Sequence, residues 1–250
     1  MNILIIGESC ADIYTYGYSS RLSPEAPVPV FQPLYTNIYG GMAMNVYENV
    51  KSLGVKADII TNDNWRDITK LRYIDDKSNH MFLRIDENDN MYGIFNLDQI
   101  KSIIKNYDAV IISDYNKGFL TEEHILSISE LHDVVFLDTK KQLGEWSKKV
   151  KYIKINNFEY EQTKHLIDND LYDILIITMG EKGCKYKNKS YPVPKVDVKN
   201  TCGAGDTFIS ALTYNFILTK DIEKSIAFAN EFATQVIQNH GPIHTKTVNK

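Results

Sequence analysis

Cysteine is scarce in this chain of 250 residues, which contains only Cys10, Cys184 and Cys202. The number is odd, the spacing is wide and no CxxC pair occurs, so the sequence indicates neither a disulfide framework nor a zinc site. Long hydrophobic runs are lacking as well. The apolar start, residues 1–7, is followed at once by acidic residues and is too short for a signal peptide or a membrane span. We therefore expect a cytoplasmic protein with a buried N-terminal strand.

A large excess of charge is also absent, since 28 basic residues stand against 32 acidic ones and the net charge is −4. General attraction to nucleic acid or to an anionic membrane is not expected, and any polyanionic ligand must be bound locally. No internal repeat, low-complexity tract or interdomain linker interrupts the chain. With 43% hydrophobic and 24% charged residues, we expect residues 1–250 to form a single domain.

Short β-branched runs recur along the chain, and each is followed by a helical pattern. Apolar strands separated by helices are typical of a parallel sheet covered on both faces, so the sequence predicts an α/β fold. The expected strands are residues 3–6, 57–61, 109–113, 134–138, 152–155 and 174–178. The expected helices are residues 42–53, 97–105, 121–131, 157–167, 203–219 and 222–239.

Two stretches break this alternation. Residues 14–39 contain four of the seven prolines, which favours extended edge strands. Residues 69–74 and 80–86 have the pattern of a strand pair joined by a polar turn. Together, the segments 14–39 and 69–86 predict a small β-layer that forms a lid over a cleft.

The sharpest signal is residues 198–208, VKNTCGAGDTF, where a polar segment runs through two glycines into an apolar helix. Gly203 and Gly205 allow a tight turn that exposes backbone N–H groups, and with Ala204 they form a candidate anion site. Asp206, in the first helical turn, would take the proton of a hydroxyl while a phosphoryl group is held in line. Alternatively, Asp206 only caps the helix. No Walker A pattern occurs in the sequence.

The Gly-Ala-Gly-Asp segment resembles the second signature of the PfkB, or ribokinase-like, carbohydrate kinases. Residues 40–45, GGMAMN, are similar to the first signature. Four further segments stand at expected strand ends in the family's order, namely residues 113–118, 137–140, 156–159 and 178–183. The resemblance implies a three-layer α/β sandwich with a central, mainly parallel sheet and a small β-sheet lid. It also implies a sugar kinase that uses ATP and Mg²⁺ and forms a homodimer through the lid.

The resemblance assigns the sugar site to two walls. Asp12 would accept hydrogen bonds from sugar hydroxyls, and Gly40, Gly41 and Asn45 would form the other wall. From the residues alone, Asp12 is also suited to capping a turn. The two glycines are equally suited to a plain turn, although they permit the close backbone approach that a sugar needs. The resemblance places Asp114 with the substrate as well.

Residues 20–30 and 69–72 are similar to stretches distinctive of the kinases that phosphorylate heptose 7-phosphate at its anomeric hydroxyl. Such a substrate already carries a phosphate, for which Arg21, Lys117 and Lys140 are the candidate clamps. Each is also compatible with an ordinary solvated surface charge. Arg21 is favoured because the proline-rich segment around it would hold it in place.

For the nucleotide, the resemblance implies that Asn156 and Glu159 orient Mg²⁺ and the phosphates through water. This suits a cation that keeps much of its hydration shell. The Asn-x-x-Glu spacing is also that of a capping box at a helix start. The remaining nucleotide-binding candidates are Thr178, Gly180, Gly183 and Asn230.

The sequence departs from the family pattern at two points. Asn200 stands where the family usually has an aspartate that helps to hold a monovalent cation, and the missing charge leaves K⁺ in question as a cofactor. A helix and a strand that normally follow residues 61–63 are missing, so we expect a trimmed sheet edge with an intact reaction centre. Two alternatives to a heptose 7-phosphate kinase stay open: a kinase for another sugar or a nucleoside, and a catalytically silent protein that binds nucleotide or sugar.

Overall fold

The computed structural model describes residues 1–197 and 201–238. Its larger sheet has eight strands in the order β12-β11-β10-β9-β8-β7-β1-β4. The six strands from β10 to β4 run parallel, and β11 and β12 are antiparallel additions at one edge. The strands are β1 (Asn2–Gly7), β4 (Lys56–Ile60), β7 (Ala109–Asp114), β8 (Val135–Thr139), β9 (Tyr152–Asn156), β10 (Leu175–Thr178), β11 (Cys184–Tyr186) and β12 (Lys189–Tyr191).

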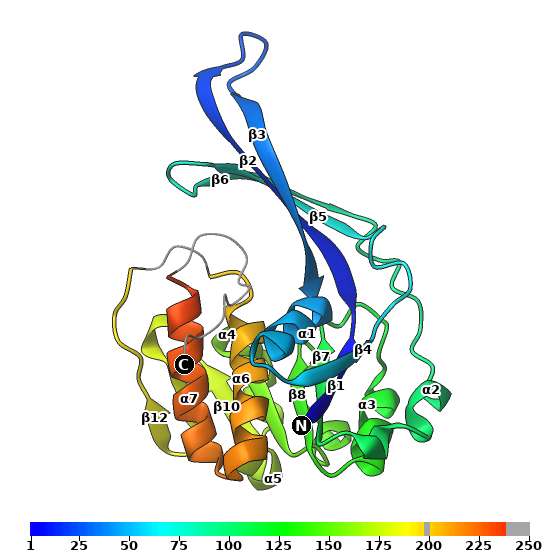
Figure 1. Ribbon diagram of the computed structural model, residues 1–250. Helices are drawn as coiled ribbons and strands as arrows, with labels where there is room; N and C mark the ends of the chain where they lie inside the picture. The colour runs from blue at the N-terminus through cyan, green and yellow to red at the C-terminus, as the bar shows by residue number, and fades with distance from the viewer. Residues whose placement is uncertain (198–200, 239–250) are drawn as a thin grey trace.

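Helices cover both faces of this sheet (Figure 1). Because side chains alternate along a strand, Ile3 and Ile5 of β1 pack with α1, α6 and α7, whereas Leu4 and Ile6 pack with α2, α3 and α5 on the opposite face. Burial on both faces explains the apolar strands and confirms the predicted three-layer α/β sandwich. The helices are α1 (Ala43–Ser52), α2 (Asp98–Lys101), α3 (Glu122–Leu131), α4 (Asn157–Thr163), α5 (Asn169–Ile174), α6 (Ala204–Thr219) and α7 (Ile222–Val236).

A second sheet, called here the small sheet, has four strands in the order β3-β2-β5-β6. Its strands are β2 (Ser9–Leu22), β3 (Pro29–Met42), β5 (Thr69–Asp75) and β6 (Met81–Glu87). β2 pairs antiparallel with β3 and parallel with β5, and β5 pairs antiparallel with β6. The hairpin of β2 and β3 projects well beyond the larger sheet (Figure 1). The small sheet is the β-layer that the sequence predicts.

Some details of the sequence-based prediction are wrong. β2 is not an edge strand but lies between β3 and β5, because the prolines of this region fall in the turn before β3 and in β3 itself. The helix expected at residues 97–105 is reduced to α2 and a 3₁₀ turn at Ile104–Asn106, and no side chain caps either segment. The prediction also missed α5 and the β11–β12 hairpin, whose strands of three residues each are too short to show a periodicity.

The larger sheet ends at β4, and residues 61–68 after it contain neither helix nor strand. This short connection to β5 agrees with the trimmed edge expected after residue 63. Within residues 1–197 and 201–238, no helix has the length and apolar character needed to span a membrane.

Candidate active site

Two cavities lie at the carboxyl ends of the parallel strands. The helix-side cavity, of about 730 Å³, is bounded by the ends of β8, β9 and β10 and by α6 and α7. The small-sheet cavity, of about 370 Å³, lies between the small sheet and the start of α6. The residues that line both cavities are Tyr115, Lys140, Gly203 and Asp206. Ligands in the two cavities would therefore meet at Asp206.

The predicted nucleotide-binding residues gather around the helix-side cavity. Gly183 has a φ of 81°, and a Cβ there would lie 2.0 Å from the carbonyl oxygen of Tyr191, so this position requires glycine. The Asn230 amide donates to the same carbonyl at 2.9 Å, which fixes the β12 end against α7. The predicted residues that line this cavity are Asn156, Thr178, Gly180, Gly183, Gly203, Ala204, Gly205, Asp206 and Asn230.

Asp206 is held by side chains from two distant segments. Asn45 Nδ2 of α1 donates to Oδ2 at 2.8 Å, and the Tyr115 hydroxyl donates to Oδ1 at 2.9 Å. No side chain caps the start of α6, so the capping alternative for Asp206 is wrong. Burial raises the pKa of Asp206 to about 6, although the hydrogen bonds from Asn45 and Tyr115 and the charge of Lys154 lower it. At neutral pH the carboxylate is thus ionised, with a basicity suited to accepting a proton.

The two motif glycines are explained by close contacts around Asp206. Gly203 has a φ of 76°, and a Cβ there would lie 2.5 Å from Asn45 Nδ2. A Cβ on Gly205 would lie 2.7 Å from Lys154 Nζ. Lys154 is itself buried in an ion pair with Asp138, with 2.7 Å between Nζ and Oδ2. A side chain at either glycine would displace a group that supports the site.

Glu8 positions the loop that carries Tyr115 and Lys117. This buried residue follows β1, and its carboxylate accepts from the Tyr115 N–H at 2.9 Å and from the Lys117 N–H at 3.1 Å. Burial, followed by the charge of Asp114, raises the pKa of Glu8. One carboxylate thereby aims a hydroxyl at Asp206 and an ammonium group into the small-sheet cavity.

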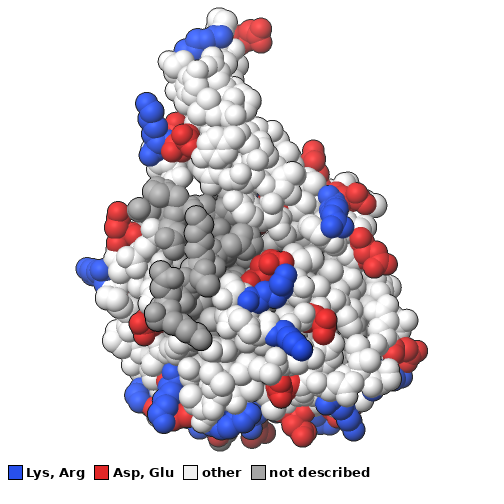
Figure 2. All heavy atoms as spheres, in the orientation of Figure 1, with Lys and Arg blue, Asp and Glu red and all other residues white. Residues whose placement is uncertain are grey.

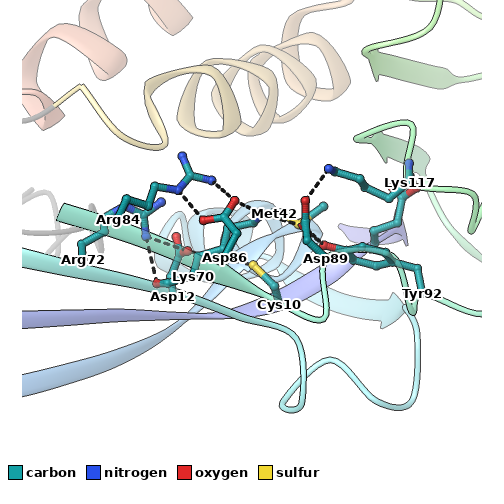
Figure 3. Close-up of polar contacts among 11 residues, drawn as sticks. Cys10, Asp12, Met42, Lys70, Arg72, Arg84, Asp86, Asp89, Tyr92 and Lys117 are labelled. Carbon is teal, nitrogen blue, oxygen red and sulfur yellow. Dashed lines mark hydrogen bonds and ion pairs between the residues drawn. The ribbon is translucent and has the colours of Figure 1, made fainter.

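The small sheet turns a charged face to its cavity. Asp12 on β2 is the cross-strand neighbour of Lys70 on β5, which in turn neighbours Asp86 on β6. Arg72 Nη1 donates to Asp12 Oδ1 at 2.8 Å, and this contact orients the carboxylate (Figure 3). Gly41 packs closely against the Asp12 carboxylate, since a Cβ at this position would lie only 2.9 Å from Asp12 Cγ. The predicted sugar-site and phosphate-clamp residues that line the cavity are Asp12, Gly40, Asn45, Lys117 and Lys140.

Arg21 and Asp114 do not join the other predicted substrate residues. Arg21 is exposed near the distal end of β2 and lines neither cavity. Asp114 is 1% exposed, accepts from the Thr139 hydroxyl at 2.5 Å and pairs with Lys141 at 2.6 Å. Its carboxylate is therefore engaged beneath the site and holds the ends of β7 and β8 together.

Asn156 and Glu159 form the capping box that their spacing allows. The Asn156 side chain accepts from the Glu159 N–H at 2.9 Å, and the Glu159 carboxylate accepts from the Asn156 N–H at 2.7 Å. Glu159 also pairs with Lys140 and does not line the helix-side cavity. Only Asn156 of this pair faces the cavity directly.

A divalent cation would be held mainly through water. Among the described residues, no group of three or more histidine, cysteine, aspartate or glutamate side chains could hold a metal ion. Asp138 Oδ1 is buried, has no hydrogen-bond partner in the described chain and belongs to a residue that lines the helix-side cavity. A carboxylate oxygen without a partner, in a residue that lines the same cavity as Asn156, fits hydrated Mg²⁺, which takes few protein ligands. Asn200, on which the K⁺ question depends, lies outside the described residues.

Comparison with known proteins identifies the family. Residues 60–248 match the family model described as pfkB family carbohydrate kinase. The chain belongs to the PfkB family. The description of the family as carbohydrate kinases agrees with the activity that the sequence resemblance implies.

Relatives and solved structures agree with this assignment. The bifunctional protein HldE of Helicobacter pylori strain J99 is 31% identical over 293 residues, covering 96% of this chain and 63% of the relative. The bifunctional protein HldE of Psychromonas ingrahamii is 28% identical over 298 residues, covering 99% of this chain and 62% of the relative. The chain thus spans less than two thirds of the length of these relatives.

Two solved structures confirm the ribokinase fold. Ribokinase from Thermotoga maritima has a TM-score of 0.71 at 16% identity, covering 96% of this chain and 95% of that one. Ribokinase from Arabidopsis thaliana, complexed with ribose and ATP, has a TM-score of 0.69 at 14% identity, covering 96% and 93%.

Several residues of the kinase site had no role in the sequence analysis. Lys70 and Arg72 stand two apart on β5, and this spacing puts both side chains on one face, a signal that could have found them. Asp138 and Lys154 are 16 residues apart and became partners only because β8 and β9 are adjacent in register. No local pattern predicts that pairing.

Removing the Tyr115 hydroxyl is expected to shift the acid limb of the kinase's pH–rate profile to higher pH. Activity rises as Asp206 loses its proton, and the hydrogen bond from Tyr115 lowers the pKa of Asp206. In Tyr115→Phe the midpoint should therefore rise, by about one unit for a hydrogen bond to a charged group. Profiles of kcat against pH measure the shift.

Tyr107→Phe is the matched control for this shift, because the Tyr107 hydroxyl donates to Asp58 at 2.9 Å, away from both cavities. An equal midpoint in Tyr115→Phe and the wild type would contradict the role given to this hydroxyl.

Proposed function

We propose that the protein transfers the γ-phosphoryl group of ATP to a hydroxyl of a phosphorylated sugar, with the anomeric hydroxyl of heptose 7-phosphate as the best candidate. The observation that carries the proposal is the position of Asp206 at the junction of the two cavities. With ATP in the helix-side cavity and the sugar in the small-sheet cavity, Asp206 lies beside both the acceptor hydroxyl and the transferring group.

In this mechanism Asp206 is the general base. It accepts the proton of the acceptor hydroxyl while that oxygen bonds to the γ-phosphorus and the bond from phosphorus to the leaving ADP oxygen breaks. Backbone N–H groups at the start of α6 stabilise the charge on the phosphoryl oxygens. Mg²⁺ bound with ATP would neutralise phosphate charge, and Asp138, Asn156 and, through water, Glu159 are the residues that would hold it.

The charge of the small-sheet cavity supports a phosphorylated acceptor. Four carboxylates line it, and they are outnumbered by cations: Lys70, Arg72, Arg84, Lys117 and Lys140. A neutral sugar does not need this excess, whereas a phosphate is recognised by such groups. Similarity to proteins named bifunctional protein HldE agrees with the choice of a heptose 7-phosphate kinase. Arg21, exposed on distal β2, is left out of the clamp.

The small sheet would act as a lid, and we infer that two lids pair in a homodimer. The cross-strand neighbours Ile38, Ile13, Leu71 and Ile85 form an apolar row on the face opposite Asp12 and Lys70, and Ile38 is 66% exposed. Below its tip the projecting sheet carries few charged side chains on the side seen in Figure 2. Pairing two such faces would remove apolar area from water. Sedimentation velocity is expected to give the mass of a dimer, and a monomeric mass would contradict this inference.

ATP consumption by the purified protein tests the function. The panel is heptose 7-phosphate, other sugar phosphates, free sugars and nucleosides, each with Mg²⁺ and with or without K⁺. We expect turnover of heptose 7-phosphate. Turnover of a free sugar or a nucleoside alone would make the protein another kinase of the family, and ATP binding without turnover of any substrate would indicate a silent binding protein.

A further inference from the structure

Asp89 provides an internal anion for the cation cluster of the small-sheet cavity. Its Oδ1 accepts from Lys70 Nζ at 2.8 Å, and its Oδ2 accepts from Lys117 Nζ at 2.5 Å (Figure 3). The Tyr92 hydroxyl donates to Oδ1 at 2.7 Å. The two ammonium groups come from separate segments, β5 and the loop after β7, and both line the cavity with Asp89. The carboxylate therefore bridges two elements across the space where a substrate would bind.

The position of Asp89 is set by a tight turn after β6. Asn88 has a φ of 56°, which asparagine tolerates better than most residues, and its side chain donates to the Asp67 carbonyl at 2.8 Å. Burial raises the pKa of Asp89, but hydrogen bonds from the two lysines and the tyrosine hydroxyl outweigh it and hold the pKa well below its usual range. Asp89 is thus an anion throughout the physiological pH range.

The two arginines of the cavity pair with carboxylates other than Asp89. Arg72 is bound to Asp12, and Arg84 makes a two-pronged contact with Asp86 at 2.7 and 2.8 Å. In residues 1–197 and 201–238, the only carboxylate paired with Lys117 is Asp89. An anion that binds between Lys70 and Lys117 therefore competes with Asp89 for their ammonium groups.

We propose that Asp89 is a resident counter-ion that makes the kinase selective for acceptors carrying a phosphate. The inference rests on the proposed function, because it concerns how the same cavity chooses its substrate. A phosphate monoester carries a charge of about −1.5 to −2 at neutral pH and has three acceptor oxygens, so it replaces both lysine contacts of a carboxylate with charge −1. A neutral sugar cannot replace them, and Asp89 then keeps the space between Lys70 and Lys117 filled. Selectivity arises because every ligand that enters this space must break the contacts of Asp89, and only a phosphate regains them through its own contacts with the two lysines.

The test is the affinity of the Asp89→Asn variant for inorganic phosphate, measured by isothermal titration calorimetry. Asparagine keeps an oxygen for the Tyr92 hydroxyl but removes the competing charge. We expect the Kd for phosphate to fall by about threefold to tenfold, the scale of one partly exposed ion pair. Glu87→Gln is the control, since Glu87 lies two residues away, is exposed and lines neither the helix-side nor the small-sheet cavity, and its substitution removes the same charge. Asp89→Ser repeats the measurement if thermal unfolding shows that the amide variant does not fold.

Lys117→Ala locates the bound phosphate. Combined with Asp89→Asn, it should abolish the gain in affinity, because the freed ammonium group is then missing. A gain that persists in the double variant, or equal Kd values for Asp89→Asn, Glu87→Gln and the wild type, would overturn the inference whatever the kinase assay gives. Tighter phosphate binding without turnover of any sugar phosphate would instead support the counter-ion and reject the proposed function.

Discussion

Replacing Asp206 with asparagine is expected to lower kcat by about 100-fold or more, the scale of general-base catalysis, with the KM for ATP changed by less than about twofold. The amide has the shape of the carboxylate and can stay beside Asn45 and Tyr115, but it cannot take the acceptor's proton. Steady-state kinetics with a coupled ADP assay measure both constants. A variant that keeps more than about a tenth of wild-type kcat would exclude Asp206 as the base.

The stability of the Asp206→Asn variant tests whether burial raises the pKa of Asp206. Burial raises the pKa of Asp206 from 3.8 to about 6, so the folded chain binds this proton more tightly than the unfolded chain does. Ionisation of Asp206 therefore leaves the free energy of unfolding unchanged below about pH 4. Above about pH 6 it lowers this free energy by about 3 kcal/mol, taking roughly two pKa units at 1.36 kcal/mol each. Asp206→Asn should accordingly be more stable than the wild type at pH 8 and equal to it near pH 4. Urea denaturation at both pH values measures this, and a less stable variant at pH 8 would contradict the burial argument.

Lys154→Met is expected to lower the free energy of unfolding by about 3–5 kcal/mol, the usual effect of removing one partner from a buried ion pair. The side chains of Lys154 and Asp138 are 4% and 8% exposed, with 2.7 Å between Nζ and Oδ2. Asp138 Oδ1 has no hydrogen-bond partner in the described chain, so without Lys154 the carboxylate would lose its ion pair and keep only the weaker interaction with the charge of Lys140. Urea denaturation followed by circular dichroism measures the change.

Two further variants separate charge from packing. Adding Asp138→Asn to Lys154→Met removes the uncompensated carboxylate and should recover most of the loss. Lys185→Met, at an exposed position on β11, should change stability by less than about 0.5 kcal/mol. If the double variant is no more stable than Lys154→Met, the loss comes from the packing of the lysine side chain rather than from its charge.

The helix-side cavity, the proposed nucleotide site, was the most predictable part of the candidate site. Asn156 and Thr178 end neighbouring parallel strands, and the carboxyl ends of such strands meet at one edge of the sheet. Each motif therefore pointed to the same cavity once the α/β class was recognised. Each motif directly follows its strand in the sequence, so these predictions required only local information.

The small-sheet cavity, the proposed sugar site, was less predictable, as Arg21 and Asp114 demonstrate. Arg21 stands nine residues beyond Asp12 on the same strand, and a strand rises by about 3.3 Å per residue, so the two are roughly 30 Å apart. Asp114 was correctly expected at a strand end, but Lys141 and Thr139 of the neighbouring segment engage its carboxylate. The position of a charged residue along the chain therefore does not determine whether its side chain faces the small-sheet cavity.

The sequence by itself determined the α/β class, the apolar strands buried on both faces, and the glycine turn that opens the helix bearing Asp206. These features depend on local periodicity and on backbone conformations that only glycine adopts easily. Only the tertiary structure decided which charges pair, such as Asp138 with Lys154 and Asp89 with Lys117. Such pairs depend on which strands are adjacent in a sheet and on the conformation of individual turns. Burial then determines how strongly the charges interact.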